Sequence, residues 1–205
     1  MREFYLFKTK RYIIALMEKE SFFKRYFTVY NIALNGIIAA LYAAITIACG
    51  PLSYSYMQVR FSEMLNLLCF FNPTCTLGLT VGCLIANAFS YVGPIDMLLG
   101  TMSTLVACIL IVIYSKFIKN LFSSGIFPVL INAIVVPFTI YISSLGTSNE
   151  MILNTKEYFI MFAWVALGEV IAIYGLGYPV FMVLAKKNRS FMKLVNASRN
   201  TDFKW

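Results

Sequence analysis

The stretch IDMLLGTMSTLVACILIVIYSKF, residues 95–117, is long and apolar enough to cross a lipid bilayer as one helix. Such a helix needs about 20 predominantly apolar residues. Further apolar segments lie at residues 32–49, 61–71, 75–91, 126–144 and 159–185. Because the segment at residues 61–71 is short, we expect it to be tilted or re-entrant and still to cross the bilayer. The pattern predicts an all-α integral membrane protein with six transmembrane helices.

The composition of the 205 residues agrees with a membrane location. Hydrophobic residues make up 60% of the chain and charged residues only 13%, about half the charged share that is usual in soluble proteins. The chain contains no His, so a His-based triad or metal site is excluded. It also has no G-x-x-x-x-G-K-[ST] motif for nucleotide phosphates. The five cysteines lie in apolar segments without a C-x-x-C pair and predict buried thiols rather than a disulfide or a cofactor site.

Lysine and arginine gather at both ends of the chain. An N-terminus inside the cell places 15 of the 17 basic residues on the cytoplasmic side and leaves only Arg60 and Lys156 outside. Because cytoplasmic loops carry the excess of basic residues, we expect both termini in the cytoplasm. Basic segments that flank an apolar body are typical of contact with anionic lipid, so no nucleic-acid partner is predicted.

Three regions follow from this charge pattern. Residues 31–187 form the transmembrane domain, between a basic amphipathic cytoplasmic segment at 1–30 and a basic cytoplasmic tail at 188–205. The first segment lacks a cleavage site that would make it a signal peptide. It either lies on the inner leaflet as an interfacial helix or forms a disordered tail.

Ionisable residues inside the apolar body are Arg60, Glu63, Asp96 and Glu169. Each costs about 2.5–3.5 kcal/mol at the centre of a membrane helix, so each needs a partner or a cavity. Arg60 and Glu63 could pair with each other at i,i+3, and Asp96 could stabilise the start of its helix. Glu169 has no basic residue within a turn and lies about 15 Å deep, which favours a ligand role.

Uncharged polar and aromatic residues extend this set toward the outer side of the membrane. Tyr56 and Gln58 share the loop that precedes Arg60, and Asn87 lies near the outer end of its segment. Carboxylates, amides and aromatic rings around one cavity suit a flat, hydrogen-bonding solute. A metal ion suits them less.

Small residues at four-residue spacing mark the first apolar segment. They are Gly36, Ala39, Ala40, Ala43 and Ala44. Small side chains let another helix approach closely. This stripe could serve internal packing or contact with another protein.

Four stretches of this sequence resemble the QueT family, which comprises substrate-binding S-components of energy-coupling factor (ECF) transporters. They are Ala39-Ala-Leu-Tyr-Ala-Ala-Ile-Thr, Gln58-Val-Arg-Phe-Ser-Glu63-Met-Leu, Gly82-Cys-Leu-Ile-Ala-Asn87 and Gly168-Glu169…Gly177-Tyr-Pro179. The resemblance covers about residues 31–187 and implies a six-helix S-component fold with an outward-opening pocket. It implies uptake of a 7-deazaguanine queuosine precursor, queuine or its aminomethyl precursor, across the bacterial cell membrane. The implied partners are a transmembrane T-component and two cytoplasmic ATPase subunits, so the chain itself is not expected to be an enzyme.

The resemblance also suggests roles for individual residues. One carboxylate can accept both the ring N–H and the exocyclic amine of a deazaguanine, and Glu169 is the first candidate for it. Asn87 and Gln58 would form hydrogen bonds with the carbonyl and the remaining donors of the base. Arg60 is a further predicted binding residue. Asp96 or Glu63 would hold a cationic aminomethyl group, and Tyr56 and Trp164 would stack on the ring. The small-residue stripe, Gly36 to Ala44, would be the docking surface for the T-component.

Other functions stay open at the level of sequence. The residue types of the predicted pocket would also suit an S-component that binds a different vitamin. A membrane-embedded enzyme would need a nucleophile–base pair or a metal cluster, and no such motif occurs. A purely structural membrane subunit is disfavoured by Glu169.

Overall fold

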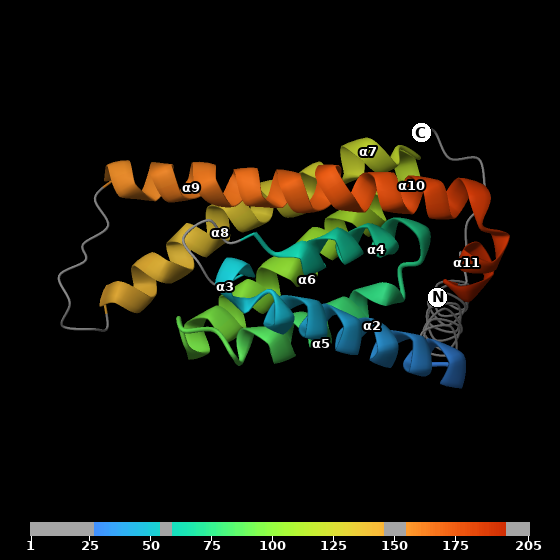
Figure 1. Cartoon of the computed structure of the whole chain (residues 1–205), viewed down its shortest axis with the longest axis horizontal. Coiled ribbons are helices and arrows are strands. Elements are labelled where there is room, and N and C mark those ends of the chain that lie inside the picture. Colours follow the sequence, from blue (N-terminus) through green and yellow to red (C-terminus); the bar gives the residue numbers. More distant parts are fainter. Residues whose placement is uncertain (1–26, 54–58, 146–154, 196–205) are drawn as a thin grey trace, which may run out of the picture.

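The computed structural model describes residues 27–53, 59–145 and 155–195, and the elements assigned in these ranges are helical (Figure 1). The longer helices are α2 (Val29–Ala48), α5 (Cys75–Asn87), α6 (Pro94–Phe117), α8 (Ile126–Leu145), α9 (Thr155–Val170) and α10 (Tyr178–Lys187). The shorter ones are α3 (Gly50–Ser53), η1 (Phe61–Leu67), α4 (Leu68–Phe71), α7 (Leu121–Ser124), η2 (Ile171–Gly177) and α11 (Arg189–Leu194). The predicted all-α class is confirmed. Residues 1–26 and 196–205, in the predicted terminal segments, lie outside the described residues.

Four helical stretches of the described chain are long and apolar enough to cross a membrane. They are Val29–Ala48, Pro94–Phe117, Leu121–Ser143 and Lys156–Lys187. Two shorter apolar stretches, Phe61–Phe71 and Cys75–Asn87, accompany them. A multi-span helical membrane protein is therefore supported by length and composition. The crossing of the two shorter stretches and the orientation of the termini stay predictions.

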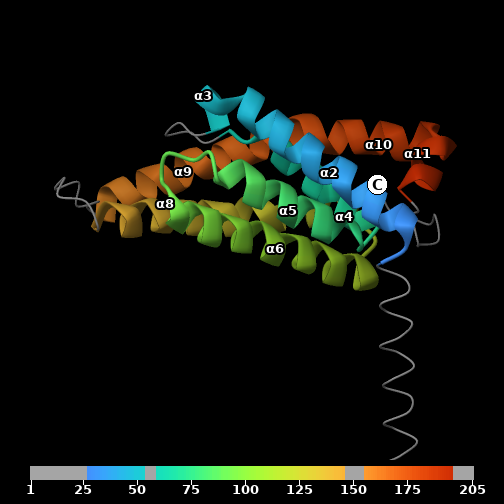
Figure 2. The same ribbon diagram turned by 90° about the horizontal axis from the view of Figure 1, so that it is seen from below.

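The helices run roughly along the long axis of the molecule. The α9, η2 and α10 elements follow one another as one long rod along one side (Figure 1). On the other side α2, α5 and α6 lie next to one another (Figure 2), with α2 packed on α5 and α5 on α6. Contacts of α6 with α8, of α8 with α9, and of η1 with both η2 and α2 complete a ring of neighbours.

The η1–α4 segment is enclosed by protein. It contacts α2, α5, α6 and η2, and every residue from Leu65 to Asn72 is buried. Because protein rather than lipid surrounds it, this segment does not need the length of a lipid-facing span.

Two departures from regular α-helix pack against each other. The η1 element is a 3₁₀-helix and η2 is a π-helix, each of 7 residues. Such stretches are uncommon at this length, and π-turns often accompany functional sites. A Cβ atom on Gly177 would lie 2.9 Å from Cβ of Met64, so glycine allows this close approach.

Close packing of α2 on α5 divides the small-residue stripe into two faces. A Cβ on Gly82 would lie 2.8 Å from the carbonyl oxygen of Ala39. Ala39 and Ala43 are buried on this inner face. Gly36, Ala40 and Ala44 are exposed. Internal packing is therefore the role of the two alanines at 39 and 43, and the other three residues remain available to a partner.

Candidate functional site

A cluster of polar side chains lies inside the bundle, with each member at most 4% exposed. Its members come from α2, η1, α5, α6, α8 and α9 and from the residue that precedes η1. They are Tyr42, Thr46, Arg60, Ser62, Glu63, Asn66, Asn87, Asp96, Ser103, Thr104, Asn132 and Glu169. Buried polar groups lower stability unless they are paired, so their hydrogen bonds show which groups the fold itself uses.

Glu63 uses both of its carboxylate oxygens inside the protein. The Tyr42 hydroxyl donates to Oε1, and the Asn66 amide donates to Oε2. Beside it, the hydroxyl oxygens of Thr46 and Ser62 lie 2.6 Å apart. Glu63 therefore ties η1 to α2 and is satisfied without a ligand.

Arg60 pairs with Asp96 rather than with Glu63. Its Nη2 lies 3.4 Å from Asp96 Oδ2, and both side chains are nearly fully buried. Asp96 is in the first turn of α6, where the helix dipole also favours a carboxylate. Helix-end stabilisation, one of the two roles considered for Asp96, fits this position, and contact with a ligand stays a prediction.

Asn87 lies beside this ion pair because Gly100 leaves room for it. Asn87 Nδ2 donates to the backbone oxygen of Asp96 at 3.3 Å and to Cys83 Sγ at 3.3 Å. A Cβ atom on Gly100 would lie 2.6 Å from Asn87 Nδ2 and 3.0 Å from Asp96 Oδ1. Glycine at this position therefore permits the polar side chains to meet over α6.

Asn132 connects Glu169 to the same helix. Its Nδ2 donates to Glu169 Oε1 at 2.8 Å, and its Oδ1 accepts from the Ser103 hydroxyl at 2.9 Å. The Ser103 hydroxyl also lies 2.7 Å from the carbonyl oxygen of Gly100. Sequence reasoning missed Asn132, because besides the ionisable residues it weighed Asn87 near the outer side of the membrane but no amide within residues 126–144. The sequence signal was the single amide side chain within the apolar residues 126–144. Burying an amide without a hydrogen-bond partner costs free energy, so this residue also needs a partner.

Three buried atoms of the cluster have no hydrogen-bond partner in the described structure. They are Glu169 Oε2, Asn87 Oδ1 and Arg60 Nε. Leaving such an atom unpaired costs about 1–3 kcal/mol, and more for a charged group. Two acceptors and one donor that the fold leaves unused are what a polar ligand would satisfy.

The remaining predicted site residues differ in their positions. Tyr56 and Gln58 fall within residues 54–58 and lie outside the described residues. Trp164 is 41% exposed. It precedes Glu169 by five residues, which turns its side chain by about 140° around the helix. The structure therefore does not bring Trp164 to the cluster.

Metal binding has no support in the described ranges, where no group of three or more His, Cys, Asp or Glu side chains could hold a metal ion. What the cluster offers is hydrogen bonding. Its free carboxylate and amide oxygens can accept from N–H groups, and its guanidinium N–H can donate to a carbonyl.

Apolar membrane-length helices around a buried hydrogen-bonding cluster define the class of this molecule, a helical membrane protein with an internal polar site. The chain belongs to the QueT transporter family, whose model matches residues 32–186. It is 30% identical over 148 residues to the "Queuosine precursor transporter QueT" of Lactococcus lactis subsp. cremoris (strain MG1363). That alignment covers 71% of this chain and 86% of the relative. No solved structure matches this chain significantly.

Proposed function

We propose that this chain binds a queuosine precursor, a 7-deazaguanine base, and is the S-component of an ECF-type importer. The name of the Lactococcus relative supports the substrate class. The observation that carries the proposal is the set of buried atoms without partners on Glu169, Asn87 and Arg60. In an apolar environment these groups are stabilised when a polar ligand fills the site.

Glu169 is the proposed recognition carboxylate. Within the described ranges its Oε2 has no hydrogen-bond partner, and Oε1 keeps a second lone pair beside the bond from Asn132. The carboxylate can therefore accept the adjacent ring N–H and exocyclic amine of a deazaguanine. Each charge-assisted bond contributes about 1.5–3 kcal/mol.

Asn87 and Arg60 complete the proposed contacts. Asn87 Oδ1 accepts from a remaining N–H of the base, and Arg60 Nε donates to its carbonyl. Gln58 and Tyr56 belong to the proposal as further contacts from the preceding loop, whereas Trp164 is left out because of its exposure.

Glu63 and Asp96 have supporting roles in this proposal. Both oxygens of Glu63 already accept hydrogen bonds from Tyr42 and Asn66. Asp96 holds Arg60. A cationic aminomethyl group on the base would compete with Arg60 for Asp96. Removal of the Asp96 carboxylate should therefore affect binding of the aminomethyl precursor more than binding of the uncharged cyano precursor.

We infer six crossings with both termini in the cytoplasm of a bacterial cell. Support comes from charges at the ends of the helices: Lys116 lies in the last turn of α6 and Lys187 ends α10, which leads to α11. Lys156 lies in the first turn of α9, and α9 starts at the opposite end of the bundle from α11 (Figure 1). Basic residues are more frequent on the cytoplasmic side. In this proposal residues 31–187 are the membrane domain.

The proposed partners are a transmembrane T-component and two ATPase subunits. The exposed small residues Gly36, Ala40 and Ala44 are the proposed docking face. ATP hydrolysis belongs to the ATPase subunits because this sequence lacks the phosphate-binding motif.

Equilibrium binding to the purified chain tests the substrate. Queuine, its aminomethyl precursor and its cyano precursor are the ligands, and riboflavin and thiamin are the controls. We expect saturable binding of at least one deazaguanine base and none of the two vitamins. Binding of riboflavin or thiamin instead would identify an S-component of different specificity.

A further inference from the structure

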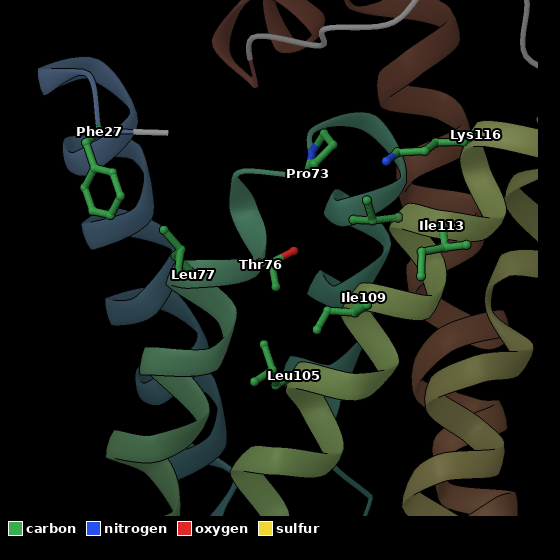
Figure 3. A pocket seen from close by; sticks show the side chains of 9 residues that line it. Phe27, Pro73, Thr76, Leu77, Leu105, Ile109, Ile113 and Lys116 are labelled. Atoms are coloured by element: carbon green, nitrogen blue, oxygen red, sulfur yellow. The ribbon is translucent and has the colours of Figure 1, made fainter. Parts of the chain in front are cut away.

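An apolar groove of about 400 Å³ lies between α5 and the second half of α6 (Figure 3), and none of its lining residues belongs to the polar cluster. Leu105, Ile109 and Ile113 of α6 form one wall, and Leu77 of α5 lies opposite. Leu77, Ile109 and Ile113 are 41%, 43% and 46% exposed, so the groove opens to the side of the bundle. In a membrane protein this side faces lipid.

One end of the groove carries a positive charge. The Lys116 side chain lines it and extends toward Pro73 across this end (Figure 3). The described acidic residues are all elsewhere: three are buried in the polar cluster, and Glu157 lies in the first turn of α9, at the opposite end of the bundle. Within the described ranges, no carboxylate at this end balances Lys116. Lys116 is exposed, so an anion from outside the described residues can approach it.

The dimensions of the groove match one leaflet of a bilayer. From Leu105 to Lys116 the helix rises about 16 Å. The hydrocarbon core is about 30 Å thick, so one leaflet is about 15 Å deep. With Lys116 at the surface of the leaflet, Leu105 would lie near the middle of the bilayer.

We propose that this groove binds one anionic glycerophospholipid. Its phosphate pairs with Lys116, and an acyl chain lies along Ile109 and Ile113. A zwitterionic lipid is a weaker ligand because its own cation already balances the phosphate. The inference uses only the membrane crossing of α6 and does not depend on which solute the polar cluster binds.

A lipid-retention measurement tests the charge. The full chain is purified from bilayers of equal parts phosphatidylglycerol and phosphatidylcholine, and the retained lipid is quantified by native mass spectrometry. We expect preferential retention of phosphatidylglycerol, with the preference reduced about five-fold in Lys116→Gln. The matched control Lys119→Gln removes a charge at the same end but outside the groove and should keep the preference. Equal retention of both lipids, or an equal loss in both variants, would overturn the proposal.

A second variant tests the apolar part of the groove. Ile109→Trp fills it and should reduce the retention of both lipids, and Ile113→Trp serves the same purpose if the first variant fails to fold. Unchanged retention in a folded variant overturns the proposal. If that variant instead fails to assemble with the transport partners, the groove is a protein interface. Base binding, measured on the same preparations, reports separately on the proposed function.

Discussion

Asn132 of α8 donates a hydrogen bond of 2.8 Å to Oε1 of Glu169 on α9. The Ser103 hydroxyl, 2.9 Å from Asn132 Oδ1, orients the amide so that its NH₂ group faces the carboxylate. Among the described residues, Oε2 of Glu169 is buried and has no partner, whereas both oxygens of Glu63 accept hydrogen bonds. This arrangement separates a carboxylate available to a ligand from one that holds the fold together.

Glu169→Gln should weaken binding of the deazaguanine base about a hundredfold, or about 3 kcal/mol. The substitution keeps the size of the side chain but replaces an acceptor oxygen with an NH₂ group that faces donors on the base. Isothermal titration calorimetry on the purified variant measures the loss, and a melting curve on the same sample reports stability.

The matched control for this variant is Glu157→Gln, which changes an exposed residue of the same helix and should leave affinity unchanged. A purely structural Glu169 predicts the reverse outcome for the variant itself. Unchanged affinity with a higher melting temperature would remove Glu169 from the site and direct attention to Asp96.

Asn132→Leu should weaken base binding about tenfold, because a hydrogen bond to a charged group contributes about 1.5–3 kcal/mol. Without the amide, Glu169 loses the contact that fixes its orientation. Thr139→Val is the control on the same helix, since Thr139 bonds only to the backbone oxygen of Val135 among the contacts described. If both variants lose affinity equally, Asn132 acts through the stability of α8 and not through Glu169.

Gly100→Ala should weaken base binding and destabilise the protein by about 1–3 kcal/mol. The added methyl group would lie 2.6 Å from Asn87 Nδ2, so Asn87 must move. Affinity and melting temperature are measured together. Gly175→Ala is the control, because a Cβ there lies 4.0 Å from its nearest neighbour. Wild-type affinity in Gly100→Ala would show that Asn87 does not contact the base.

Ala40→Trp and Ala39→Trp should fail in different ways. Ala40 is exposed, so its substitution should abolish uptake by cells with the complete transporter and leave base binding by the purified chain intact. Ala39 is buried against Gly82, so the same change should prevent folding. Normal uptake with Ala40→Trp would mean that the partner docks on another face of the protein.

The membrane class and most of the long helices could be predicted from the sequence. The apolar segment at residues 95–117 corresponds to α6 (Pro94–Phe117), and that at 126–144 corresponds to α8 (Ile126–Leu145). Hydropathy is sufficient here because a segment in lipid must satisfy its backbone hydrogen bonds internally, which leaves the helix as the local solution.

The surroundings of the short segment at residues 61–71 could not be predicted from the sequence. Its length suggested a tilted or re-entrant helix, and its enclosure by α2, α5, α6 and η2 depends on contacts with distant parts of the chain. The π-helix at Ile171–Gly177, which packs against it, carries no sequence pattern that we used.

For the site, the sequence by itself determined which residues are too costly to leave unpaired in an apolar segment, because that cost depends on residue type and local surroundings. This reasoning selected Arg60, Glu63, Asp96 and Glu169, and all four are buried. Only the tertiary structure decided their partners: Arg60 joins Asp96 across 36 residues, and Asn132 joins Glu169 across 37. A hydrogen bond requires atoms to meet within about 3 Å, and that geometry arises from how whole helices pack, which no local stretch of sequence encodes.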